Sequence, residues 1–192
     1  MIARVRRLAA QHQDDFSKRV LAFAEINYGT PASADPPLRA LLSNPGNDAE
    51  LPYLMGLRHL MAGRLLEGEA RATAYQEALR WLARAHRIAP DHYPTLLRYA
   101  EALSEGADYG SQNMRDILLN ALDLAPQVGT VRLAAAHVLA FRGETDLARE
   151  ILEPMVRSTH NPAAHQAADL LGQLQRGERP TRQHFAQILS VR

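Results

Sequence analysis

The chain has 192 residues, of which 22 are Lys or Arg and 21 are Asp or Glu, giving a formal net charge of +1 at pH 7. A near-neutral charge argues against a nucleic-acid-binding protein, because binding to phosphates needs a concentrated excess of basic side chains. The absence of cysteine excludes disulfides, thiolate zinc sites and a cysteine nucleophile.

The chain contains no apolar stretch that reaches the roughly 20 residues of a membrane-spanning helix. The most hydrophobic run, Leu51 to Leu66, is interrupted by two arginines and a histidine. The basic first residues lead into the polar run Gln11 to Asp15, where a secretory signal would have its apolar core. We therefore expect no membrane span and a cytoplasmic location, with a periplasmic location open if Met1 is not the native start.

The first quarter of the chain alternates one long helical pattern with proline-rich segments. Apolar residues at helical spacing predict a single helix over residues 2–26. Three prolines and a glycine in residues 27–37 predict a break, which is followed by a short helix over 38–42 and a second break at 44–47. Residues 1–48 are thus either a divergent first repeat or a capping helix with a loop.

Glycines and prolines then recur at regular distances, which is the most informative pattern in the sequence. The glycine breaks are separated by 38, 37 and 34 residues, and a proline break falls between each two. Such an interleaved pattern predicts consecutive helix pairs. The glycines are Gly68, Gly106, Gly143 and Gly177, and the prolines are Pro90, Pro126 and Pro162.

Between these breaks, apolar residues recur every three or four positions, which is typical of amphipathic helices. Ser111 is predicted to cap one helix, and Thr145 and Thr181 offer hydroxyl groups near the starts of two others. No alternating strand pattern competes with these helices. They are predicted over residues 93–105, 111–124, 128–141, 145–158, 162–175 and 180–190.

The helix pairs resemble tetratricopeptide repeats, a family with a period of about 34 residues, small residues where two helices cross, and a proline after the second helix. The resemblance covers residues 55–190. Its departures are about five extra residues after Gly68, Met155 in place of a late alanine, and Arg182 where a small residue is expected. The matching positions are Tyr75-Gln76-Glu77-Ala78, Leu82, Ala85 and Pro90, then Ala100, Leu103, Ala121 and Pro126, then Ala136, Leu139, Gly143, Ala148 and Leu152.

The resemblance implies an all-α fold, a right-handed α-solenoid of stacked antiparallel helix pairs with about nine or ten helices. The repeats would span residues 49–90, 91–126, 127–160 and 161–192, with the last pair a degenerate cap.

Neither metal chemistry nor catalysis has a visible motif. Two zinc ligands on one helix need a spacing of three or four residues, and no pair among the histidines has it. Trp81 and the tyrosines, Tyr109 among them, are interpreted as core residues. We therefore predict no catalytic residues, no metal site and no cofactor. The histidines are His12, His59, His86, His92, His137, His160, His165 and His184.

Stacked helix pairs leave a concave surface lined by the first helix of each pair. This surface is predicted to be a mostly apolar groove that binds a helix or an extended segment of a protein partner. The groove differs from the clamp with which some family members hold a chaperone's C-terminal carboxylate, because the matching positions carry no lysine or asparagine. The predicted partner-binding residues are Arg58, Leu97, Glu101, Leu133, His137 and Phe141.

Three alternatives stay open beside a non-catalytic interaction scaffold. The groove could be filled by the chain's own N-terminal helix, whose Val5, Leu8, Phe16 and Val20 need a place to pack. The chain could be an accessory repeat domain of a larger enzyme, such as a peptidase or transferase. It could also be a freestanding hydrolase or metal protein that uses histidines from several helices.

Overall fold

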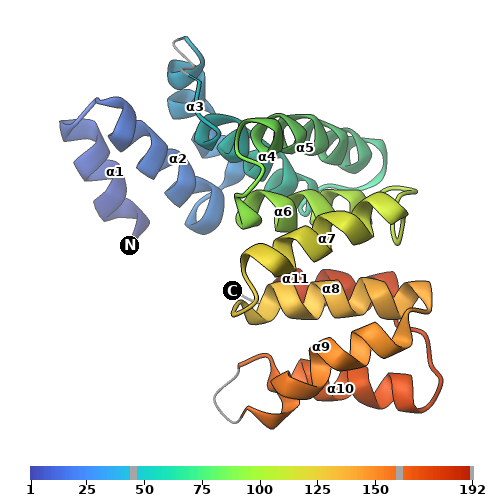
Figure 1. Cartoon of the computed structure of the whole chain (residues 1–192). Helices are drawn as coiled ribbons and strands as arrows, with labels where there is room; N and C mark the ends of the chain where they lie inside the picture. Colours follow the sequence, from blue (N-terminus) through green and yellow to red (C-terminus); the bar gives the residue numbers. More distant parts are fainter. Residues whose placement is uncertain (44–46, 159–161, 191–192) are drawn as a thin grey trace. The chain divides into compact units, whose positions relative to one another are not determined.

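The computed structural model describes residues 1–43, 47–158 and 162–190, and within them every regular element is a helix (Figure 1). The predicted all-α class is confirmed. The described residues form eleven α-helices and one short 3-10 helix, and contacts divide the chain into two compact units, Met1–Pro90 and Asp91–Arg192. The predicted breaks at 44–47 and at His160-Asn161-Pro162 fall largely on residues 44–46 and 159–161, outside the described part.

Unit 1 begins with two helices where the sequence predicts one. Asp14 accepts a hydrogen bond from the Ser17 amide at 2.7 Å and so caps a new helix within the polar run after Gln11. The elements of unit 1 are α1 (Ile2–Gln11), α2 (Asp15–Tyr28), the 3-10 helix η1 (Pro31–Ala34), α3 (Asp35–Leu42), α4 (Glu50–Gly63) and α5 (Gly68–Ile88).

The proline-rich segment is more helical than predicted. α2 continues to Tyr28, η1 follows, and α3 begins at Asp35 rather than at Leu38. Pro36 and Pro37 lie in the first turn of α3, where a helix needs no amide donor, so prolines are compatible with the helix there.

The helices α4 and α5 form the first pair of the predicted series. A Cβ atom at Gly56 would lie 2.6 Å from Cγ of Leu82, so glycine at this position lets the two helices approach closely. α2 packs on α1, η1, α3 and α4. The N-terminal segment and the first pair therefore lie in one compact unit, Met1–Pro90.

In unit 2, α6 packs on α7 and α8 packs on α9, and contacts between α7 and α8 and between α9 and α10 continue the series. The first two pairs lie within residues 91–126 and 127–160. The helices are α6 (Tyr93–Ser104), α7 (Gln112–Leu124), α8 (Gly129–Arg142), α9 (Thr145–Arg157), α10 (Ala164–Gln175) and α11 (Arg182–Ser190).

Local signals end and begin several of these helices. Gly143 and Gly177 adopt left-handed conformations, with φ of 86° and 73°, and the amide after each glycine returns to a carbonyl of the last helical turn. Ser111 caps α7 as predicted, accepting a hydrogen bond from the Met114 amide at 3.2 Å. Thr145 is the first residue of α9 rather than its cap.

The last predicted pair, residues 161–192, is arranged differently from the others. α10 packs on α9 and α8, whereas α11 packs on α8 and α6, and Figure 1 shows α11 behind α8. Arg182, which stands where a small residue is expected, faces the carboxylate of Glu105 at 3.8 Å instead of a helix crossing.

Candidate functional site

Five of the six residues predicted to line a groove lie in unit 2, on α6 and α8. α11 lies on both helices. Leu97 of α6 is 7% exposed and Leu133 of α8 is 1% exposed. The groove that the sequence predicts is therefore occupied by the C-terminal helix, and its apolar floor is buried.

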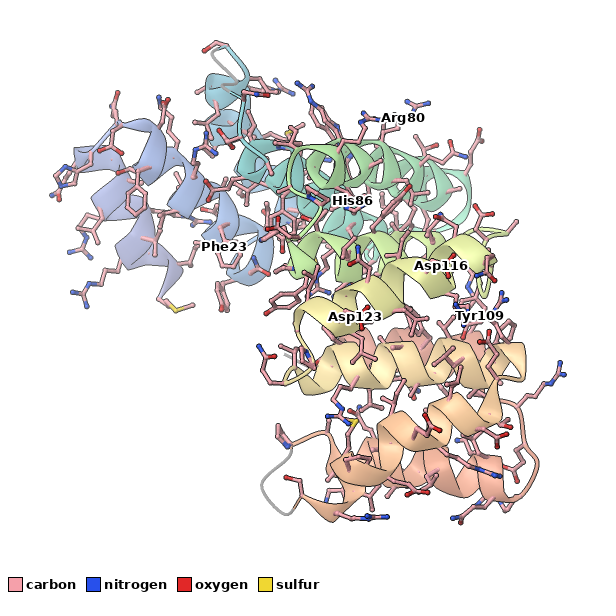
Figure 2. The ribbon with its side chains drawn as sticks, viewed as in Figure 1. Phe23, Arg80, His86, Tyr109, Asp116 and Asp123 are labelled. Atoms are coloured by element: carbon pink, nitrogen blue, oxygen red, sulfur yellow. The ribbon has the colours of Figure 1, made fainter. Side chains whose placement is uncertain are left out.

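The N-terminal helix, which the sequence suggests as an alternative occupant of the groove, is divided into α1 and α2. Val5, Leu8, Phe16 and Val20 line a cavity of about 180 Å³ between α1 and α2. Leu8, Phe16 and Val20 stay 49%, 75% and 41% exposed, and the neighbouring Phe23 is also exposed (Figure 2). These side chains cover one another only in part.

An apolar stripe fixes α11 in the groove. Phe185, Ile188 and Leu189 are 0%, 7% and 4% exposed, and their spacing of three and four residues places them on one face of the helix. The Phe185 ring lies 5.8 Å from the Tyr109 ring and 5.6 Å from the His137 ring. Tyr109 in turn lies 4.5 Å from the Phe141 ring. We call Tyr109, His137 and Phe141 the aromatic socket.

The connection between α6 and α7 brings Tyr109 (labelled in Figure 2) to the socket. Gly110 has a φ of 71°, and a Cβ atom there would lie 2.5 Å from the Phe141 ring. Nη1 of Arg142 donates a hydrogen bond to the Gly110 carbonyl at 2.7 Å. The connection is thus held against α8, and any residue other than glycine at position 110 would push the ring of Phe141 away.

His137 is the polar member of the socket and is 1% exposed. Its Nδ1 lies 3.2 Å from the Tyr109 hydroxyl, and its buried Nε2 has no hydrogen-bond partner among the described residues. Burial, and then the nearby His184, lower the pKa of His137 to about 4, against a smaller raising effect of the Thr181 backbone. Burial also raises the pKa of Tyr109. Both groups are therefore uncharged at neutral pH.

The two charged residues predicted for the groove are held in ion pairs. Glu101 is 5% exposed and accepts a hydrogen bond from Arg98 at 2.6 Å. Arg58 belongs to unit 1, where its guanidinium binds both carboxylate oxygens of Asp35 at 2.7 and 2.8 Å. Among the predicted residues, His137 and Phe141 are joined through Tyr109, whereas Arg58 links α4 to α3 through Asp35.

α11 leaves part of the groove unfilled. A cavity of about 420 Å³ lies between α8, α10 and α11, and its α10 side is a polar stripe at helical spacing. Asp169 in this stripe has no ion-pair partner among the described residues, and the nearby Arg176 is paired with Glu178 at 2.7 Å. The polar side chains that line the cavity are His137, Gln166, Asp169, Gln173, Arg176, His184 and Gln187.

Phe185, Tyr109 and Asp169 are not among the residues predicted from the sequence to line the groove. Phe185, Ile188 and Leu189 do form an amphipathic pattern, so the presence of an apolar face could be read from the sequence. Which helices that face contacts depends on contacts between distant residues, and the spacing carries no information about them.

No protein-family model, curated protein or solved structure matches the chain. In the part of the chain that the structure describes, no three His, Asp or Glu side chains are grouped so as to hold a metal ion. No helix in the same residues has both the length and the apolar character needed to cross a membrane.

Proposed function

We propose that the protein is a non-catalytic protein–protein interaction scaffold, a right-handed solenoid of tetratricopeptide-like helix pairs that binds a helix of a partner protein on the surface of α6 and α8. The observation that carries this proposal is that an amphipathic helix, α11, already lies on this surface. A groove that accepts one apolar helical face has the shape and the chemistry to accept another.

The chemistry of the groove supports binding rather than turnover. Leu97 and Leu133 supply apolar area, which drives association. His137 is uncharged at neutral pH because its pKa is lowered to about 4, and Glu101 is neutralised by Arg98. The floor therefore presents little net charge to an incoming helix, and recognition rests on shape and aromatic contacts.

The repeat architecture supports the same proposal. The pairs α4–α5, α6–α7 and α8–α9 recur in step with the glycines and prolines of the sequence. In such an array the first helices of neighbouring pairs line a binding surface, and within unit 2 these first helices are α6 and α8. We propose a cytoplasmic protein partner and no cofactor. We propose no nucleic-acid partner because the chain's net charge is +1.

A photo-cross-linking experiment in the native source tests this proposal. A benzoylphenylalanine residue replaces Gln173, which lines the open part of the groove. The matched control carries it at Asp123, an exposed residue of α7 (Figure 2). We expect protein adducts from position 173 that are missing from position 123. Identical adducts from both positions, or none from position 173 in a chain of unchanged helicity, would refute the assignment of function to this groove.

A further inference from the structure

We propose that the partner helix displaces α11, and that it carries an aromatic residue at the position of Phe185, aliphatic residues three and four positions later, and a basic residue directly before the aromatic one. This inference rests on the proposed function, because it names the kind of helix that the groove accepts. Its evidence is the way in which α11 fills one part of the groove and leaves another part open.

The aromatic requirement follows from the socket. Phe185 is fully buried, and its ring lies 5.8 Å from Tyr109 and 5.6 Å from His137. Tilted ring pairs at these distances contribute beyond the burial of their area. A side chain smaller than an aromatic ring would leave a void beside the rings of Tyr109 and His137, and a charged one would be desolvated there.

The aliphatic requirement follows from the same helical face. Ile188 and Leu189 are 7% and 4% exposed, and they lie three and four residues after Phe185. α11 packs on both α8 and α6, so its apolar face must cover two helices at once. A pair of adjacent aliphatic residues widens the stripe enough to do so.

The basic requirement follows from the cavity that α11 leaves open. His184, the residue before Phe185, lines this cavity together with Asp169. Arg176 at the cavity edge is already paired with Glu178, so the carboxylate of Asp169 dominates the local charge. A lysine or arginine at the position of His184 would extend a flexible cation into the space of about 420 Å³ and meet this carboxylate.

α11 is held mainly by its apolar face, and its short length favours exchange for another helix with the same face. α11 has nine residues, a length at which an isolated helix is marginal in water. The ion pair between Arg182 and Glu105 is long, at 3.8 Å, and both side chains are partly exposed, so it contributes little. A partner helix that keeps the aromatic anchor and also fills the cavity would bind the groove better than α11 does.

A displacement assay on the full chain tests the inference. A protease site is inserted between Arg179 and Pro180, and a fluorophore is attached through Ala186→Cys, which is unique because the chain has no other cysteine. Ala186 is exposed, so the label leaves the apolar face free. After cleavage, circular dichroism and high anisotropy show that the chain is folded with its labelled α11 in place. Unlabelled peptides of residues 180–192 then compete for the groove.

We expect the Phe185→Ala peptide to compete at least about 100-fold less well than the unchanged peptide, from the usual effect of removing a buried ring. The His184→Lys peptide should compete about two- to five-fold better. That gain should vanish against a chain carrying Asp169→Asn, whereas the unchanged peptide should compete equally well against both chains.

The outcomes separate this inference from the proposed function. Equal competition by the unchanged and Phe185→Ala peptides, or no gain from His184→Lys, would overturn the inference while helix binding by the groove stands. If the unchanged peptide itself fails to displace the labelled helix at any concentration, the groove is no exchangeable helix site, and the proposed function fails with the inference.

Discussion

Protonation of His137 in the unfolded chain should lower the free energy of unfolding of the protein as the pH falls from about 7 to 5. The pKa of His137 is lowered from its ordinary value of 6.5 to about 4, first by burial and then by His184, with the Thr181 backbone opposing the shift. In the unfolded chain the imidazole regains its ordinary pKa. The unfolded state therefore binds more protons between these two pKa values, and the free energy of unfolding falls as the pH falls.

The magnitude follows from the two pKa values. A difference of one pKa unit corresponds to about 1.4 kcal/mol, so complete protonation in the unfolded state destabilises the native state by about 3 kcal/mol. Between about pH 7 and pH 5, His137 should remove about 2 kcal/mol of that amount. Above about pH 7 the contribution of His137 is negligible, because the imidazole is neutral in both states.

Urea unfolding of the full chain at several pH values measures this effect. His137→Asn keeps a polar group near the Tyr109 hydroxyl and removes the titration, so its stability should change less with pH than that of the unchanged chain. His59 lies in unit 1, and its pKa is also lowered, first by burial and then by Arg58. A parallel His59→Asn variant removes the titration of this second histidine. Equal pH slopes for the unchanged chain and His137→Asn would refute the reasoning, as would an imidazole proton resonance of His137 that titrates near its ordinary pKa.

Two further substitutions test the local structure of unit 2, each by urea unfolding against a matched control. Ser111→Ala should lower the free energy of unfolding by about 1 kcal/mol through loss of the cap on α7. Thr145→Ala, at a helix start without a side-chain cap, should change the free energy of unfolding by less than about 0.5 kcal/mol. Equal losses in the two variants would contradict the assigned caps. Gly110→Ala combines a left-handed backbone with a clash against Phe141 and should destabilise the protein by more than about 2 kcal/mol. Gly68→Ala has a left-handed backbone but open space around it, so a loss as large as that at Gly110 would show that the clash is unimportant.

The helix series could be predicted from the sequence because its signals are local. A glycine such as Gly143 ends a helix by its own backbone conformation, and Ser111 begins one through a hydrogen bond three residues away. Such signals act within a few residues, so their spacing along the chain fixes the helix ends. The break at Asp14 follows the same rule and could have been predicted, because Asp14 and Ser17 have the spacing of a cap and its amide.

The contents of the groove could not be predicted in the same way. The positions of Leu97 and Leu133 on first helices indicate a shared apolar surface, but any amphipathic helix of the chain could cover it. Both α1 and α11 have a suitable apolar face, and only contacts between residues far apart in sequence select α11. The cavity beside Asp169 depends on how completely α11 fills the groove, which is a property of packing volumes and not of periodicity.

The aromatic socket links the occupancy of the groove to the protonation of His137. The pKa of His137 is low because the ring is buried beside Phe185 and the Tyr109 hydroxyl, and because His184 lies nearby. A partner helix with an aromatic anchor would replace Phe185 and keep the imidazole dry and neutral. A helix without that anchor would admit water, so the pKa of His137 would return toward its ordinary value. Titration of this one imidazole in the presence of a bound peptide therefore reports whether the aromatic anchor is seated, independently of how tightly the rest of the helix binds.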